Sequence, residues 1–186
     1  MEHDIKIQML VERVAVLNDK AAFEELFNSY YQKLHRFALG IVRDKHIAED
    51  VVSDVFINIW RNRARLIEID NFSSYIYITT RNIAIRKTTR LSNTQHADMY
   101  ELQILSEETV LSPEDILLNT ELLKCYADAV KALPPRCKNI YQLAKQDGLR
   151  YKEIAAILNV SVKTIDAQLA IAIRSITKHV RSLIKN

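Results

Sequence analysis

Residues 153–176 have the sequence "EIAAILNVSVKTIDAQLAIAIRSI", which is typical of two helices joined by a tight turn. A first helix is predicted over about 151–158, with the turn at Asn159-Val160-Ser161. Asn tolerates a positive φ, and Ser161 can cap a second helix that begins at Val162. The residues expected to pack these helices on each other and on the preceding pair are Ile154, Ala155, Leu158, Val160, Ile165, Leu169, Ala172 and Ile176.

The outward face of this motif is suited to DNA bases, although it carries few cations. Gln168 can pair bidentately with adenine, while Thr164, Ala167 and Ile171 offer methyl contacts to thymine. Attraction to phosphate is expected from flanking cations: Arg136, Lys138, Arg150, Lys152, Lys163 and Arg174. The alternatives are an ordinary αα-hairpin and a solvated basic surface.

The rest of the chain predicts an all-α protein. Only two glycines and three prolines interrupt 186 residues, and apolar residues recur at helical spacing. Helices are expected over about 5–17, 21–42, 46–66 and 72–90, with Asp44 as a cap of the third. Ser112-Pro113 then starts a helix that runs to about Leu133, and another covers about 136–146.

Charge divides the chain into three parts. Residues 1–90 contain 14 Lys and Arg residues and 12 Asp and Glu residues. Residues 91–111 contain no basic residue and 4 acidic ones, and residues 112–186 contain 12 basic and 7 acidic residues. The net charges are therefore +2, −4 and +5. We expect two small helical domains, 1–90 and 112–186, joined by a flexible acidic connector.

Several classes of function are not supported by these residues. The five histidines accompany no nucleophile or carboxylate pair, and no phosphate loop is present, so we expect neither an enzyme nor a cofactor or small-molecule substrate. Cys125 and Cys137 form no metal motif and are expected to be free, partly buried thiols. No run approaches the about 20 apolar residues that span a bilayer, and no secretion signal begins the chain, so a cytoplasmic protein is expected.

From about Ala21 onward the chain resembles an RNA polymerase sigma factor of the extracytoplasmic-function class. The resemblance rests on four ordered segments: "AAFEELFNSYYQKLHRFA", "AEDVVSDVFINIW", "FSSYIYITTRNIAI" and "ALPPRCKNIYQLAKQDGLRYKEIAAILNVSVKTI". It implies that 1–90 is sigma region 2 and 112–186 is sigma region 4. The implied partners are core RNA polymerase, through its β′ and β subunits, and promoter DNA; a membrane-anchored anti-sigma factor is a further partner common in the family.

The segment "EDVVSDVFINIWRN", 49–62, resembles the helix with which the family docks on the β′ coiled coil. By spacing alone, Asp50, Asp54, Ile57 and Arg61 form one outward stripe that suits a helical partner, and without the resemblance this stripe would be a solvated face. The residues assigned to polymerase binding are Glu49, Asp50, Asp54, Ile57, Asn58 and Arg61.

The loop at 61–71 and the helix after it resemble the minus-10 promoter reader of the family, which captures flipped bases of the melted strand. Tyrosine rings can stack on bases, and arginines supply charge. The residues assigned to this role are Arg63, Arg65, Asn71, Tyr75, Tyr77, Arg81, Asn82 and Arg86, with Lys87 and Arg90 nearby. Tyr75 stands where many members have Trp, and core packing is the alternative for either tyrosine.

The helix-turn-helix resembles the minus-35 reader of region 4. The residues assigned to it are Arg150, Lys152, Ser161, Lys163, Thr164, Ala167, Gln168, Ile171 and Arg174. The family commonly has a basic residue at Ala170 or Ile171 and His or Arg at Gln168, so weak binding of isolated region 4 is expected. Attachment to polymerase would then keep the motif beside DNA at high effective concentration.

Two other functions remain open at the level of sequence. A helix-turn-helix regulator would bind DNA without core polymerase and would leave the Asp50 and Asp54 face indifferent to mutation. A helical adaptor protein would show no salt-dependent retention on DNA.

Overall fold

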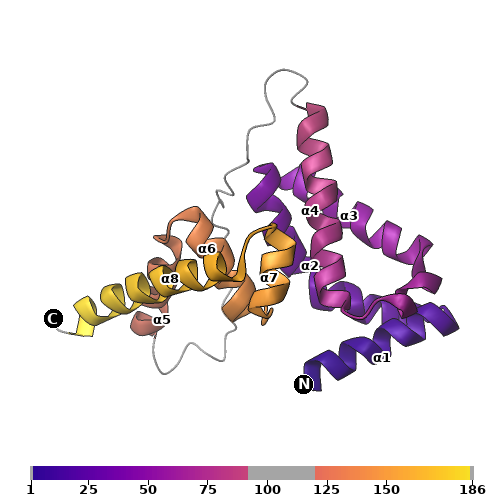
Figure 1. Cartoon of the computed structure of the whole chain (residues 1–186), viewed down its shortest axis with the longest axis horizontal. Coiled ribbons are helices and arrows are strands. Elements are labelled where there is room, and N and C mark those ends of the chain that lie inside the picture. The colour runs from indigo at the N-terminus through magenta and orange to yellow at the C-terminus, as the bar shows by residue number, and fades with distance from the viewer. Residues whose placement is uncertain (1, 92–119, 185–186) are drawn as a thin grey trace. The chain divides into compact units, whose positions relative to one another are not determined.

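The computed structural model describes residues 2–91 and 120–184, and within these ranges every regular element is a helix (Figure 1). The prediction of an all-α fold is therefore confirmed. The chain divides into two units, Met1–Tyr100 and Glu101–Asn186. Apart from Leu91, the predicted connector at 91–111 lies outside the described residues, as does the predicted helix start at Ser112, so the predicted domain limits stay predictions.

The first unit is built around its second helix. Its elements are α1 (Glu2–Leu17), α2 (Lys20–Val42), α3 (Lys45–Arg61), the 3-10 helix η1 (Arg63–Glu68) and α4 (Phe72–Leu91). α2 packs against α1, α3 and α4, while η1 packs against α1. The predicted inward face of α3 is buried at Ala48, Val52, Val55, Phe56 and Ile59.

An aromatic cluster joins α2 to α3. The ring centroids of Phe27 and Phe56 lie 4.7 Å apart, and those of Phe23 and Trp60 lie 4.9 Å apart. Phe56 is only 4% exposed. Close, tilted rings of this kind stabilise a fold by more than the burial of their apolar surface alone. This cluster is therefore a main contribution to the packing of α3 on α2.

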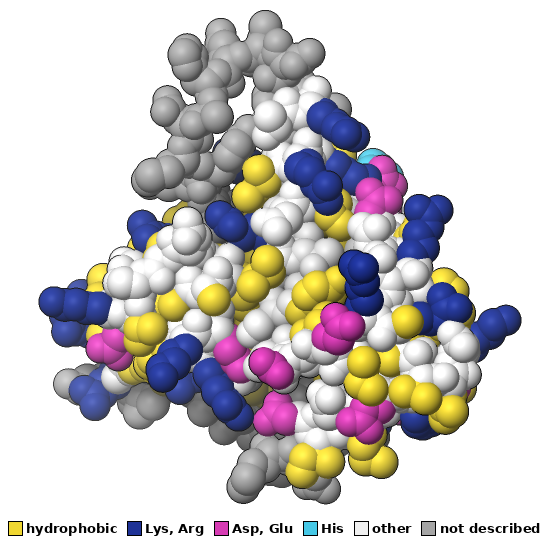
Figure 2. All heavy atoms as spheres, turned by 45° about the vertical axis from the view of Figure 1, so that its right-hand side comes forward, with side chains coloured by type: hydrophobic (Ala, Val, Ile, Leu, Met, Phe, Trp, Pro, Cys, Tyr) yellow, Lys and Arg dark blue, Asp and Glu magenta, His cyan; other side chains and the backbone are white. Residues whose placement is uncertain are grey.

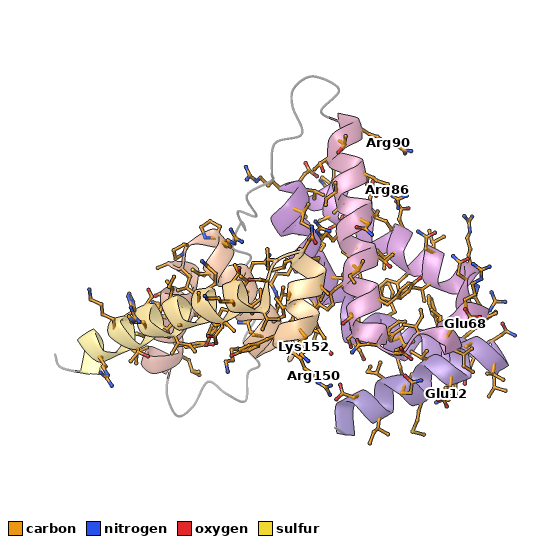
Figure 3. The ribbon with its side chains drawn as sticks, viewed as in Figure 1. Glu12, Glu68, Arg86, Arg90, Arg150 and Lys152 are labelled. Atoms are coloured by element: carbon orange, nitrogen blue, oxygen red, sulfur yellow. The ribbon has the colours of Figure 1, made fainter. Side chains whose placement is uncertain are left out.

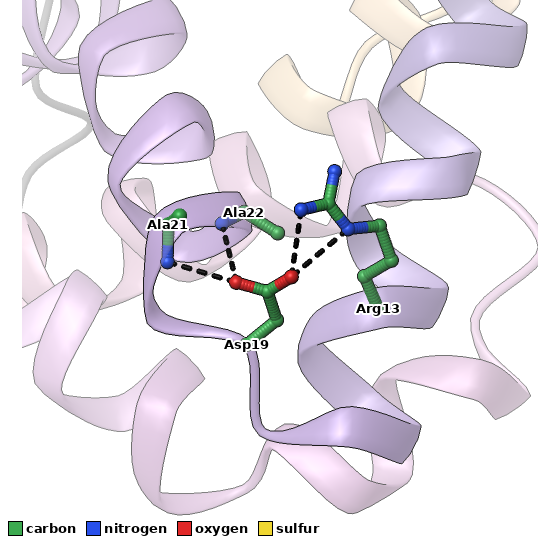
Figure 4. A network of polar contacts seen from close by, with 4 residues as sticks. All are labelled: Arg13, Asp19, Ala21 and Ala22. Carbon is green, nitrogen blue, oxygen red and sulfur yellow. Dashed lines mark hydrogen bonds and ion pairs between the residues drawn. The ribbon is translucent and has the colours of Figure 1, made fainter.

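The start of α2 is fixed by a polar network at the turn from α1 (Figure 4). One carboxylate oxygen of Asp19 accepts hydrogen bonds from the backbone N–H groups of Ala21 and Ala22, and the other accepts two from the Arg13 guanidinium at 2.7 and 3.0 Å. The Ala22 bond first, and then Arg13, hold the pKa of the Asp19 carboxyl below its usual value. The cap thus ties the end of α1 to the first turn of α2.

The second unit is built around its last helix. Its described elements are α5 (Thr120–Lys131), α6 (Pro135–Tyr141), the π-helical turn η3 (Gln142–Gln146), α7 (Tyr151–Leu158) and α8 (Val162–Ile184). α8 packs against α5, α6 and α7. Ile154, Ile165 and Leu169 are buried between the helices as predicted. The predicted helix over about 136–146 is present as α6 followed by the π-helical turn.

The connection from η3 to α7 depends on Gly148. Its φ is +75°, a backbone conformation that L side chains rarely adopt, and the following Leu149 N–H donates to the Leu143 carbonyl at 3.0 Å. Glycine therefore permits the tight reversal that brings the chain to the first helix of the turn motif.

A membrane-spanning helix must be both long enough to cross the bilayer and apolar along that length. None of the described helices meets both requirements alone; α7 with most of α8 does so only as a pair, across a bend of 107°.

Candidate nucleic-acid and protein interfaces

α3 presents the outward stripe that its spacing predicts. Asp50, Asp54, Ile57 and Arg61 follow one another at intervals of four, three and four residues, which places them on one side of a helix. Ile57 is 49% exposed, whereas the adjacent Phe56 is buried. An exposed branched apolar side chain between charges is a feature of a surface that a partner can cover.

Ion pairs connect this stripe to the neighbouring helix. The Lys87 Nζ atom of α4 lies 2.9 Å from Asp54 Oδ2 and 3.8 Å from Asp50 Oδ2. Within α3 itself, the Oε2 atom of Glu49, a half-buried member of the predicted set, lies 3.8 Å from His46 Nδ1. Lys87 was expected near DNA, but in the folded unit its ammonium group neutralises part of the acidic stripe.

Arg63 lies at the start of η1, and its guanidinium contacts neighbouring residues of the same unit. Its guanidinium lies 4.7 Å from the ring centroid of Trp60, donates to the Trp60 carbonyl at 2.8 Å and also donates to Asn18 Oδ1. Cation–π and hydrogen-bonding contacts therefore engage this partly exposed side chain in the folded unit, and its predicted contact with DNA stays a prediction. Arg65, two residues later, is exposed as expected.

Asn71 also has a structural role, at the start of α4. Its Oδ1 accepts a hydrogen bond from the Ser74 N–H at 2.7 Å. Asn side chains commonly satisfy the first backbone donors of a helix in this way. The residue is exposed as a whole, and its Oδ1 atom is engaged at the start of the helix.

α4 brings three of the predicted minus-10 residues together. Tyr75, Asn82 and Arg86 are spaced by seven and four residues, so they share one side of the helix, and Asn82 and Arg86 are exposed. Arg86 and Arg90 project from the C-terminal half of α4, where basic side chains gather on the surface (Figures 2 and 3). Arg81 lies about 100° around the helix from Asn82 and belongs to a different side.

Tyr77 is the clearest error among the predicted site residues. It is 1% exposed, and its ring meets Phe37 of α2 edge to face at a centroid distance of 5.3 Å. The prediction of a stacking surface at Tyr77 is wrong because α4 packs against both α2 and α3, which buries a wider arc than one helical stripe.

The turn motif of the second unit has the predicted geometry. Asn159 adopts a φ of 55°, and Ser161 Oγ accepts a hydrogen bond from the Thr164 N–H at 3.1 Å. The hydroxyls of Ser161 and Thr164 also bond at 2.8 Å, so the Thr164 oxygen is engaged at the cap. Among the residues of the predicted reading face, the exposed ones are Lys163, Ala167, Ile171 and Arg174.

Basic side chains flank the motif, with one exception. Arg150 and Lys152 are exposed and extend from the N-terminal end of α7 (Figure 3). Arg136 is exposed as well, but Lys138 is 5% exposed, so the prediction of Lys138 as a phosphate contact is wrong. Burial, and to a smaller extent nearby Lys131, lowers the pKa of Lys138.

Two further cations continue the face of α8 beyond the motif. Lys178 and Arg181 are exposed and follow Arg174 at intervals of four and three residues. This spacing places all three on one side of α8. The same spacing is readable in the sequence, so this extension of the basic face could have been predicted.

Gln168 lies at the edge of the reading face, toward α6. It is half-buried, and the Cys137 thiol donates a hydrogen bond to its Oε1 at 2.8 Å. Cys137 precedes Gln168 by 31 residues, and no local pattern in the sequence indicates this contact. Cys125 and Cys137 are free thiols as predicted, and both are buried rather than partly buried. Over the ranges that the structure covers, no group of three or more His, Cys, Asp or Glu side chains is arranged to hold a metal ion.

Family models match both units. Residues 26–94 match the model described as Sigma-70 region 2, and residues 123–176 match the model described as Sigma-70, region 4. The first match contains α3 and α4 with their exposed stripes, and the second contains the turn motif. Together the two matches cover more than half of the chain.

Whole proteins match along most or all of the chain. The ECF RNA polymerase sigma factor SigW of Bacillus subtilis is 24% identical over 175 residues, which cover 89% of this chain and 92% of that protein. The ECF RNA polymerase sigma-E factor of Escherichia coli K12 is 27% identical over 193 residues, with full coverage of both chains.

Two solved structures have a similar fold. CnrH, solved in complex with the cytosolic domain of CnrY, matches with a TM-score of 0.54 and 18% identity over 95% of this chain and 98% of that chain. The sigma factor RpoE of Bartonella quintana, solved with the anti-sigma factor NepR, matches with the same TM-score and identity over 86% of this chain and 96% of that chain.

Proposed function

The chain belongs to the sigma-70 family as an extracytoplasmic-function sigma factor, and from this premise we propose which of its residues bind core RNA polymerase and which read the promoter. The polymerase-binding surface is the α3 stripe of Asp50, Asp54, Ile57 and Arg61, with Glu49 and Asn58 at its edge. The single observation that carries this assignment is the exposure of Ile57 between charged residues on an otherwise well-packed helix. A helical partner can cover Ile57 and pair with the charges around it.

The minus-10 element is read by one side of α4. Tyr75 supplies a ring for stacking, Asn82 an amide and Arg86 a positive charge, and the three residues share this side by their spacing. Arg65 and Arg90 add attraction to the phosphates of the melted strand. Tyr77 and Arg63 are left out of this reader because the fold engages both of them.

The minus-35 element is read by the N-terminal half of α8. Ala167, Gln168 and Ile171 face the bases, while phosphate is bound by Lys163, Arg150, Lys152, Arg174 and the two cations that follow Arg174. A recognition helix in this position of a helix-turn-helix enters the major groove. A regulator that used only this motif is not favoured, since residues 26–94 also match region 2.

Other aspects of the assignment follow from the family. The chain acts as an initiation factor and not as a catalyst, and we place it in the cytoplasm with the polymerase. Two structural neighbours were solved with CnrY and with the anti-sigma factor NepR, which supports an anti-sigma partner for this chain as well.

Promoter-dependent transcription tests the proposed function directly. We expect the chain, added to core polymerase, to produce transcripts from a subset of a randomised promoter library and none without core. Sequencing the transcribed templates gives the two promoter elements. The assignment would be contradicted if the chain bound DNA but neither bound core polymerase nor produced transcripts with it.

Replacing Lys163 with alanine is expected to weaken promoter binding by a similar factor on every promoter sequence, because a phosphate contact carries no base information. The slope of log affinity against log salt should fall by about 1 in magnitude. Holoenzyme binding to labelled promoters at several salt concentrations measures both. Lys145→Ala, at another exposed lysine of the second unit, is the control, and a loss confined to one promoter base would instead make Lys163 a base reader.

A further inference from the structure

We propose that Cys137 determines specificity at the minus-35 element, because its thiol binds the Gln168 amide oxygen and leaves only the amide NH2 group for DNA. This inference rests on the proposed function of α8. It assigns a role in base choice to a buried residue of a different helix.

The contact is built into the packing of the second unit. α6, which carries Cys137, packs against α8 (Figure 1), and Cys137 itself is 3% exposed. Gln168 Oε1 lies 2.8 Å from Cys137 Sγ. Because Cys137 is buried, this oxygen faces the interior of the unit. Burial outweighs nearby Arg136 and raises the pKa of the Cys137 thiol, so the sulfur keeps the proton that it donates.

The chemistry of the amide then decides which bases fit. Bidentate pairing with adenine needs the oxygen and the NH2 group of Gln168 to face the base edge together, one accepting from N6 and the other donating to N7. When the oxygen faces Cys137, it cannot accept the hydrogen bond from adenine N6, so bidentate pairing with adenine is excluded. The remaining NH2 group can donate to N7 and O6 of guanine or to O4 of thymine. Gln168 should therefore favour guanine or thymine at its position, and the bidentate adenine contact expected from the sequence is replaced.

The experiment is transcription by core polymerase with the full chain on a library randomised through the minus-35 element. At one position the wild type should favour guanine or thymine over adenine. Cys137→Ala frees the oxygen, so the share of adenine relative to guanine should rise about fivefold or more there. Cys137→Ser keeps a donor and should retain the wild-type profile. Cys125→Ala removes the other buried thiol of this unit and is the matched control.

A second variant keeps the test decisive if Cys137→Ala fails to fold. Gln168→Glu replaces the donor by a carboxylate at a half-buried position, so preference should move to cytosine or adenine, which offer amino donors. If either Cys137→Ala or Gln168→Glu still directs transcription and shows the wild-type base profile, the inference is overturned. Absence of promoter-dependent transcripts with the wild-type chain would instead overturn the proposed function.

Discussion

Replacing Asp54 with lysine is expected to lower the affinity of the chain for core RNA polymerase at least about tenfold. Asp54 lies beside exposed Ile57 on the α3 stripe, and its side chain is 46% exposed. Reversing a charge within a complementary interface places like charges together, which costs several kcal/mol. The same substitution should change the free energy of unfolding by only about 1 kcal/mol, because the ion pair that it removes and the like charge that it places beside Lys87 lie at a partly exposed surface.

Titration of core polymerase into a fluorescently labelled chain measures the affinity, and thermal unfolding checks the fold. Glu24→Lys is the matched control: it makes the same charge change at an exposed position of α2 in the same unit. The control should bind core as the wild type does. Equal affinities for Asp54→Lys and Glu24→Lys would remove the α3 stripe from the polymerase interface.

Phe56→Ala is expected to lower the free energy of unfolding of the first unit by about 3–5 kcal/mol. The side chain is 4% exposed and lies against the rings of Phe27 at 4.7 Å and Phe23 at 6.0 Å, so its removal leaves a cavity that the helices cannot fill. Because domain stabilities are commonly about 5–15 kcal/mol, such a loss removes a large share of the total.

Urea unfolding monitored by tryptophan fluorescence measures this loss, since Trp60 is the single tryptophan and lies in the first unit. Ile57→Ala is the control, because it truncates the adjacent residue on the exposed side of α3 and should change stability by about 0.5 kcal/mol or less. Similar midpoints for the two variants would show that Phe56 is not a central core residue.

The helices themselves were predictable because their signals are local. Apolar spacing placed Val52, Phe56 and Ile59 on the inward side of α3, and the capping residues Asp44 and Ser161 lie where helices begin. The turn at Asn159 needed only the tolerance of Asn for positive φ. Each of these features depends on residues within two turns of one another.

The predictions that were wrong concern how much of a helix its neighbours cover. Tyr77 belongs to the α4 helix as expected, but the joint packing of α2 and α3 extends the buried arc to include it. Lys138 is buried on a short helix packed against α8, although its charge indicated the surface. Spacing shows which side of a helix faces inward, but not how wide the covered side is.

The amino-acid sequence was thus sufficient for the all-α class, the order of the helices, the turn motif and the exposed stripe of α3, because local spacing and capping specify them. Tertiary packing alone buried Tyr77, engaged Arg63 with Asn18, paired Lys87 with Asp54 and turned the Gln168 oxygen toward Cys137. Most of these contacts join residues that are tens of positions apart. Their geometry exists only once the helices have packed, so the chemistry that each reading residue can offer to DNA is settled at that stage.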